Sequence, residues 1–583
     1  MIESMLAKNR YVLSLEGLGG LWISIATTLL ETKFLVDFIS RETPSRTLSP
    51  DMLSMLLAYI ASVIGLPLVL AWIPGALKEL SKMYRAFAER SCLPFRIPKL
   101  RTRLSLLGFA IPISSLCVVA SIVLSNPLLA LAGFVPTLIA SLVILAPVVA
   151  LGEHRRRIDT ELPWFAVLLD LSESVGAGIK FLGERIRRTR ILPAISKELD
   201  AIARDARLRS SSYIDSLMRR ADLTPSYRLS RFLRGYASRL RSGSPIVQWL
   251  RMWILEEFMR SEFSYRMFSE RASIMISQVA IGIYVFVPVV MAALGALSSP
   301  LMLIVPVVGT PALIALAYAI RPKTMDCIDR KHIVLPAILC IATSIMLFPL
   351  LKGYAVIAGW LLGIVAGIKA YSQVRECSML RRDSFDILNY VTELRRIGLS
   401  IPSALKQISK ESKLHKISRR RIEEVLQLHE LGVPLTETIR YVRTPSFMFK
   451  FVVFSLGIMH ESGASDPSVI QRLLETLRRI DVLEESSRKV ALLFDALSVA
   501  TIGIVIWIAK TLAGIVSVTS TYTLAATLQV FPVAPQLSLL IPIALLGYSI
   551  VSTILRTGAP IFELRQVAFL AIALLAVVAL TLF

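Results

Sequence analysis

The stretch Glu161-Leu-Pro-Trp-Phe-Ala-Val-Leu-Leu169, followed by the turn Val175-Gly-Ala-Gly-Ile179, indicates the basic structural unit of this chain. A similar arrangement returns about 222 positions later, as Asp383-Ser-Phe-Asp-Ile387 followed by Ile397-Gly-Leu-Ser-Ile401. Each arrangement belongs to a polar, strongly basic segment that lies between runs of membrane-grade hydrophobicity. Sequence identity is low, but the common plan and spacing predict an old internal duplication, because a fixed period is the signature of repeated structural units.

The two polar segments, 151–271 and 371–489, show the periodicity of amphipathic helices. In the first, Leu162, Phe165 and Leu169 recur at steps of three and four residues, which places them on one helix face. The second contains an apolar stripe of the same kind, made by Ile470, Leu473, Leu474, Leu477 and Ile480. In no stretch do apolar and polar residues alternate with the period of two that is typical of β-strands joined by hairpin turns. The sequence therefore predicts an all-α protein in which these segments form two antiparallel helical bundles.

A helix, a glycine, a short turn and a new amphipathic helix recur inside both segments. Glycine just past a helix end accepts the left-handed backbone conformation that closes the last turn. We expect this role for Gly176, Gly243, Gly398, Gly432 and Gly463. Taken alone, each glycine is what commonly ends a helix in a helical hairpin.

The rest of the chain is too apolar for a soluble protein, with 55% hydrophobic residues and a mean hydropathy of +0.64. A helix of about 20 residues crosses a hydrocarbon core about 30 Å thick. About ten spans are predicted, at roughly 52–74, 104–124, 128–151, 273–297, 300–320, 332–350, 353–370, 490–516, 537–555 and 567–583. The sequence shows no cleavable signal peptide, and it leaves open whether 11–39 enters the membrane.

The placement of the net charge of +23 predicts the topology. The link between the first two spans and the link at 321–331 are rich in Lys and Arg, whereas those at 125–127, 298–300 and 517–536 are nearly free of charge. Under the positive-inside rule, the basic links and both bundles face the cytoplasm, and the C-terminus lies outside. We therefore expect a multi-pass protein of the cell membrane.

These features predict six parts. They are an N-terminal segment with the first span and a basic loop (1–103), a pair of spans (104–151), bundle 1 (152–272), four spans (273–370), bundle 2 (371–489) and three C-terminal spans (490–583).

Residue patterns typical of catalysis or metal binding are missing from the sequence. It has no Gly-Lys dipeptide, so a P-loop is excluded. The five cysteines form no C-x-x-C pair. His429-Glu430 and His460-Glu461 do not continue into H-E-x-x-H, so a zinc site at helical spacing is unsupported. We expect no catalytic, cofactor-binding or metal-binding residues, and no enzymatic activity.

Two ionisable residues, Asp495 and Lys510, share the predicted span 490–516. Fifteen residues on one helix separate them by about 22 Å, too far for an ion pair. Both lie near span ends, so we expect them to reach the membrane interfaces. A contact with another helix or a filament subunit is the next alternative, and proton coupling is a third.

Arginine clusters suggest two kinds of partner. The run at 155–157 directly follows a span, and we expect it to contact anionic lipid headgroups. Two further clusters lie deeper in the bundles and suit an acidic protein partner: Arg185, Arg187 and Arg188, and Arg419, Arg420 and Arg421. Nucleic acid is not expected, because interleaved aromatic residues and reader motifs are missing.

Several of these motifs resemble a known family. The pattern Leu-Pro-x-Phe-x-x-x-Leu with its Val-Gly-x-Gly-Ile turn (162–179), the Gly-x-Pro-Leu turn (432–435) and a helix entering a span at 490 resemble the type II secretion F domain. That domain is the core of the platform proteins of type IV filament machines. Its twofold occurrence among many spans resembles the archaeal branch, in archaella and archaeal type IV pili. The resemblance covers roughly 104–555, although bundle 1 lacks a clear third glycine turn.

The resemblance implies a membrane assembly platform. Its bundles would dock a hexameric secretion ATPase through the two deeper arginine clusters, and its spans would pass motion to prepilin-like filament subunits. A homodimer is compatible with this scheme, and the type of filament stays open. The helix 466–489 running into 490–516 would be a lever between bundle and membrane. The chain has only three asparagines, which hints at a heat-adapted source.

The main alternative is a secondary transporter built from two repeats. That function requires matching polar groups at the bilayer midplane in both halves. A shift of 222 positions places Asp495 on Ser273, so the first half has no acidic counterpart. A membrane enzyme is a weaker alternative, because no nucleophile, base and metal constellation is visible.

Overall fold

The computed structural model describes residues 127–582, except 210–211, 272–273, 275, 288–300, 322–324, 327–328, 352, 411–413, 464–465 and 520–533. The described residues form helices joined by short turns and contain no strand, so the all-α prediction is confirmed. The predicted spans 52–74 and 104–124, and the segment 11–39, lie outside the described residues.

Three helices within these ranges are long and apolar enough to cross a membrane: Lys331–Leu351, Gly353–Arg396 and Leu539–Thr557. They coincide with the predicted spans at 332–350, 353–370 and 537–555. Shorter apolar helices, at Ser277–Phe286, Val305–Ile320 and Gln566–Val578, overlap three further predicted spans. The total of ten spans stays a prediction.

The chain divides into two compact units, whose boundaries fall inside helix α6 (Pro127–Ser174), inside α8 (Pro193–Leu208) and directly after α10 (Tyr227–Ser242). The first unit extends to Asp159 and includes Lys197–Ser242; the second comprises Thr160–Ser196 and Gly243–Phe583. The first unit contains the beginning of α6 (Pro127–Ser174), most of α8 (Pro193–Leu208), α9 (Tyr213–Leu223) and α10 (Tyr227–Ser242).

The second unit contains the end of α6, the start of α8 and the remaining helices. These are α7 (Gly178–Thr189), α11 (Ile246–Arg271), α12 (Ser277–Ile281), the π-helix η2 (Gly282–Phe286), α14 (Leu301–Ile320), α15 (Arg330–Leu351), α16 (Gly353–Arg396), α17 (Ile401–Lys410), α18 (Lys416–Glu430), α19 (Leu435–Thr438), α20 (Phe447–Glu461), α21 (Pro467–Thr519), α22 (Ala534–Thr557) and α23 (Gln566–Leu582).

A buried charged network joins three helices of the first unit. The Glu198 carboxylate on α8 lies 3.0 Å from Nε2 of His154 on α6 and accepts a 2.6 Å hydrogen bond from Nε of Arg220 on α9. All three side chains are almost completely buried. Burial alone would raise the pKa of Glu198, but hydrogen bonds from His154 and Arg220 hold the pKa below its usual 4.5.

In the second unit, α20 is the most completely buried helix of the second basic segment. Nearly every side chain from Phe447 to Met459 is buried, as expected for a helix that is apolar on all sides. The helix packs closely against α19: a Cβ atom on Gly457 would lie 2.7 Å from the backbone nitrogen of Thr436. Glycine at this position therefore permits a contact that any larger residue would disrupt.

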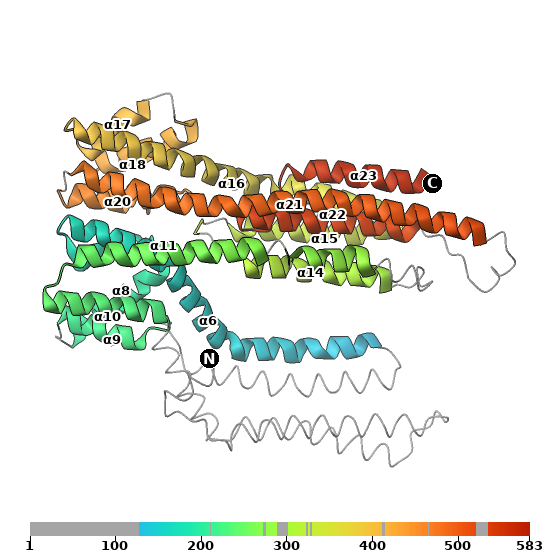
Figure 1. Cartoon of the computed structure of the whole chain (residues 1–583), viewed down its shortest axis with the longest axis horizontal. Helices are drawn as coiled ribbons and strands as arrows, with labels where there is room; N and C mark the ends of the chain where they lie inside the picture. The colour runs from blue at the N-terminus through green and yellow to red at the C-terminus, as the bar shows by residue number, and fades with distance from the viewer. Residues whose placement is uncertain are drawn as a thin grey trace, which may run out of the picture. The chain divides into compact units, whose positions relative to one another are not determined.

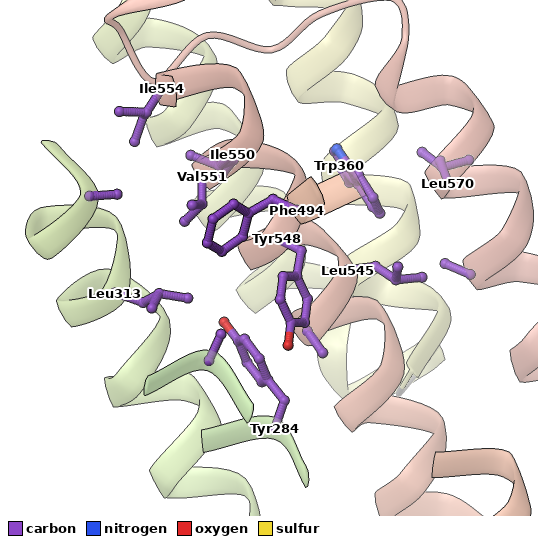
Figure 2. Packing of buried hydrophobic residues seen from close by; sticks show 14 of the residues in the cluster. Tyr284, Leu313, Trp360, Phe494, Leu545, Tyr548, Ile550, Val551, Ile554 and Leu570 are labelled. Atoms are coloured by element: carbon purple, nitrogen blue, oxygen red, sulfur yellow. The ribbon is translucent and has the colours of Figure 1, made fainter. Parts of the chain in front are cut away.

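The apolar helices of the same unit enclose a second core, in which α14, α16, α21, α22 and α23 meet (Figure 2). Tyr284 and Tyr548 lie at its centre, with ring centroids 5.3 Å apart. The Tyr284 hydroxyl lies 2.7 Å from the Thr310 hydroxyl, and Tyr548 accepts a 3.1 Å hydrogen bond from Thr501. Each buried phenol thus has a polar partner, which removes the penalty of burying it unpaired.

Two continuous helices connect these cores. Figure 1 shows α16 and α21 running from the bundle formed with α17, α18 and α20 to the apolar group formed with α15, α22 and α23. At 1.5 Å per residue, the 53 residues of α21 give a rod about 80 Å long. Neither α16 nor α21 is interrupted between its polar and its apolar part, so each helix belongs to both cores.

All five turn glycines predicted from the sequence have a left-handed backbone. The φ angles are 74° for Gly176, 66° for Gly243, 91° for Gly398, 90° for Gly432 and 72° for Gly463. In this region a Cβ atom is strained, so glycine is the residue that ends these helices without cost.

The helices of the two basic segments begin and end at corresponding positions. Helix α6 ends at Ser174 and α16 at Arg396, a shift of 222 positions. The starts of α9 at Tyr213 and α19 at Leu435 differ by the same 222. The start of α8 at Pro193 falls within one residue of the start of α18 under this shift.

Candidate docking and coupling site

The α7–α20 contact brings the first basic segment against the second, inside the second unit. Nε of Arg185 on α7 lies 2.9 Å from the Glu461 carboxylate on α20. Nη1 of Arg185 lies 3.2 Å from Glu437 on α19. Arg188, one turn further along α7, approaches Glu437 to 3.3 Å. A pair of arginines on one segment therefore meets a pair of glutamates on the other.

Aromatic packing reinforces the same contact. The indole of Trp164 on α6 meets the rings of Phe447 and Phe451 on α20 edge to face, with centroids 5.0 and 4.9 Å apart. This geometry places positive ring edges over negative ring faces and adds stabilisation beyond the buried area. Trp164 belongs to the stretch that opens the repeated pattern.

The first predicted docking cluster is thus largely engaged within the chain. Arg185 is 21% exposed, and both its carboxylate partners are mostly covered, which marks it as a structural residue. Arg188 is 54% exposed and pairs with Glu184 at 2.6 Å as well as with Glu437. Arg187 lies between them on α7 and is half-buried. Of the three arginines, Arg188 presents the most charge to solvent.

The second docking cluster divides in the same way. Arg421 is 20% exposed and binds Glu376 on α16 at 2.8 Å and Glu424 at 2.9 Å. Arg419 donates a hydrogen bond from Nε to the carbonyl of Leu414. Arg420 is 79% exposed and lies 3.3 Å from Glu424. Arg421 therefore fastens α18 to α16, whereas Arg420 extends into solvent.

Two buried carboxylates occupy corresponding positions in the segments, 222 positions apart. Glu161 accepts hydrogen bonds of 2.8 Å from the backbone N–H groups of both Ala194 and Ile195, at the start of α8. Asp383 accepts a 3.0 Å bond from the backbone N–H of His415, at the start of α18, and a 2.8 Å contact from the His415 ring. Each carboxylate satisfies donors that a helix start leaves free and stabilises the helix dipole.

The sequence reasoning did not identify these carboxylates as site residues. Glu161 and Asp383 are the first residues of the two stretches of the repeated pattern, so an acidic residue at the same place in both stretches was a signal that the sequence contained. Their partners lie 33 and 32 residues further along the chain. No local pattern connects residues at that distance.

Among the apolar helices, Asp495 on α21 forms a 2.8 Å ion pair with Arg556 on α22. Arg556 also lies 3.6 Å from the buried Glu563. The leading expectation from the sequence is that Asp495 reaches the membrane interface; this ion pair instead fits the second alternative, a contact with another helix. Lys510 lies on the same α21 helix, nearer its C-terminal end. In the part of the chain that the structure describes, no three His, Cys, Asp or Glu side chains gather in a way that could hold a metal ion.

Comparison with known proteins gives one match. Residues 387–512 match the model of the family described as type II secretion system (T2SS), protein F. The matched segment begins within α16, contains α17 to α20 and ends within α21. The chain is thus similar to this family over most of the second basic segment and over the part of α21 that continues beyond it. No curated protein and no solved structure shows a significant match to the chain.

Proposed function

We propose that this chain is the integral membrane assembly platform of a type II secretion or type IV filament machine and has no catalytic activity of its own. The observation that carries the proposal is the family match over 387–512, because its domain indicates a membrane platform protein of such systems. The three helices long enough to cross a membrane fit this assignment.

The proposed platform contains the domain twice, with 152–272 as the second copy. The corresponding helix boundaries and turn glycines support this interpretation. The buried carboxylates of Glu161 and Asp383 support it independently, because each binds the start of the equivalent helix. A duplicated domain among about ten spans, with both bundles in the cytoplasm, resembles the archaeal filament platforms.

The proposed partner in the cytoplasm is a hexameric assembly ATPase, and the partners in the membrane are prepilin-like subunits. Arg188 and Arg420 are the best docking residues of the two clusters, since both are more than half exposed. Exposed charge at the rim of an interface chiefly affects association rate and salt dependence. Motion of the docked bundles would reach the filament subunits through α16 and α21, which continue from the bundle into the apolar helices.

Binding of the ATPase tests the docking role. The full-length protein, reconstituted in lipid nanodiscs, would be titrated with the purified hexameric ATPase of the same cell. Combining Arg188→Glu with Arg420→Glu should weaken binding about tenfold, because two attractive charges become repulsive. The binding constant should also lose much of its salt dependence.

Arg382→Glu is the matched control, because Arg382 is exposed on α16 but belongs to neither cluster. This variant should bind the ATPase as the wild type does. Absence of any measurable ATPase binding by the wild-type protein, together with solute uptake in proteoliposomes, would favour the two-repeat transporter instead.

A further inference from the structure

A cavity of about 390 Å³ lies where several apolar helices of the second unit end. Its walls come from the segment after α14, the middle of α16, α21 and the turn between α22 and α23. The charged lining consists of Arg321, Arg375, Arg381, Arg556 and Arg565, with Asp326 and Glu563. Arginine thus outnumbers carboxylate, and the cavity attracts anions.

Two of the arginines are fixed by groups of the protein. Arg321 donates hydrogen bonds to the carbonyl oxygens of Ile554 and Arg556, near the end of α22. Arg381 lies 3.2 Å from Oδ2 of Asp326. These contacts hold the walls of the cavity in place.

The remaining arginines differ in how well they are neutralised. Arg556 pairs with Asp495 and lies near Glu563. Arg375 and Arg565 are exposed, and Arg565 lies close enough to Glu563 for the two charges to attract each other. Because both side chains are exposed, an external anion can reach their guanidinium groups. Guanidinium matches the geometry of phosphate oxygens and can bind two of them at once.

The position of the cavity indicates the source of that anion. Helix α14 ends at Ile320, α15 begins at Arg330, α22 ends at Thr557 and α23 begins at Gln566. The ends of α14 and α22 and the start of α23 thus lie at residues of the cavity wall or next to them, and α15 begins four residues after the wall residue Asp326. In a bilayer, the ends of such helices lie at the level of the lipid headgroups. The hydroxyl of Tyr371 also lines the cavity and can donate to phosphate oxygens, whereas the Ser378 hydroxyl donates to the carbonyl oxygen of Arg375.

We propose that this cavity binds the phosphate group of an anionic phospholipid, with Arg375 and Arg565 as the principal contacts. Basic pockets between apolar helices at the cytoplasmic surface are suited to such headgroups. The proposal rests on the membrane placement in the proposed function, but it requires neither an ATPase nor a filament subunit.

Lipid retention by the purified full-length protein tests the proposal. Protein extracted from nanodiscs of phosphatidylcholine mixed with phosphatidylglycerol would be analysed by native mass spectrometry. The wild type should retain phosphatidylglycerol in preference to phosphatidylcholine. Changing Arg375→Gln and Arg565→Gln together should weaken this preference about tenfold. Arg382→Gln, a change at an exposed arginine outside the cavity, should leave it intact.

Equal retention of phosphatidylglycerol by the wild type and the double variant would overturn the assignment. So would an equal loss in the Arg382→Gln control, because that result would indicate an effect of general surface charge.

Thermal unfolding in detergent provides a second test. If inorganic phosphate stabilises the wild type as much as phosphatidylglycerol does, the ligand is free phosphate and the lipid source is wrong. Replacing both arginines by lysine, with folding verified by circular dichroism, should restore part of the preference.

Loss of the lipid preference and loss of ATPase binding are measured separately. A protein that binds the ATPase but shows no lipid preference would disprove this inference alone. A protein that prefers phosphatidylglycerol but binds no ATPase would disprove only the docking role.

Discussion

The guanidinium of Arg185 lies 2.9 Å from the carboxylate of Glu461, and this pair connects two segments that are separated by more than 250 residues along the chain. Their side chains are 21% and 12% exposed, so the pair is largely shielded from water. Arg185 therefore belongs to the packing of the α7–α20 contact rather than to an open docking surface.

We expect Arg185→Ala to destabilise the second unit by about 1–3 kcal/mol, because it leaves covered carboxylates without their partner. The midpoint of thermal unfolding, followed by tryptophan fluorescence, measures the change. Arg188→Ala removes a more exposed charge from the same helix and should cost less than about 1 kcal/mol. If the two substitutions lowered the stability equally, the shielding of Arg185 from water would not make its ion pairs stronger than those of Arg188.

The buried carboxylates give a prediction for each basic segment. Glu161→Leu should speed amide hydrogen exchange at Ala194 and Ile195, because their N–H groups lose their acceptor. Asp383→Leu should do the same at His415. Each change should destabilise its helix start by about 2 kcal/mol.

The measurement is hydrogen exchange followed by mass spectrometry of peptides that cover the starts of α8 and α18. Glu153→Leu is a control, because Glu153 lies on the same α6 helix and its side chain is 44% exposed. A faster exchange in only one of the two segments would argue against equivalent roles for Glu161 and Asp383.

The stability of the first unit should depend on pH through Glu198. Its pKa in the folded protein lies below the usual 4.5, so the folded state favours the ionised carboxylate. This contribution to the free energy of unfolding is fully present above the unfolded pKa and is lost as the pH falls through the folded pKa. Glu198→Gln should therefore destabilise the protein at neutral pH, and the difference from wild type should shrink below pH 4.5.

At neutral pH we expect the cost of Glu198→Gln to be about 3 kcal/mol, because it leaves Arg220 charged and buried without its carboxylate. Urea unfolding at several pH values measures the difference. A constant difference between wild type and variant from neutral pH to well below pH 4.5 would show that Glu198 does not titrate with folding.

The α21 helix leads to a prediction about coupling. Leu473 is 3% exposed in the polar part of this helix. Leu473→Asp places a charge in an apolar contact, which costs several kcal/mol and should separate α21 locally from the bundle. Leu477→Asp, at a fully buried position one turn later, should act in the same way.

Both aspartate variants should enter the membrane normally but assemble few or no filaments. Membrane fractionation and electron microscopy of cells provide the two measurements. Arg479→Asp introduces the same side chain at an exposed position of α21 and should leave filament assembly unchanged. Normal filaments in the Leu473→Asp and Leu477→Asp cells would count heavily against a lever role for α21.

The sequence predicted those features that depend on local pattern. The helical periodicity, the turn glycines Gly398 and Gly432, and the apolar helices 332–350 and 353–370 can all be read from neighbouring residues. What it could not predict are pairings between distant segments. Asp495 meets Arg556 61 residues later, and the sequence offers many arginines at comparable distances. Only the packing of α21 against α22 selects that partner.

The same limit explains the arginine clusters. A run of basic residues indicates charge but not exposure, and the fold gives neighbouring positions opposite environments. Arg420 reaches into solvent, whereas Arg421 is held between Glu376 and Glu424. Helical geometry turns each successive residue by about 100°, so one arginine of a run can face outward and the next inward.

Asp326, in the segment between α14 and α15, binds two helices at once. One of its carboxylate oxygens accepts the backbone N–H of Phe447, the first residue of α20, at 3.0 Å, and the other binds Arg381 on α16. Sliding either helix past the other would break one of these bonds. A pull on the connection between α14 and α15 would therefore act on α16 and on the start of α20 together.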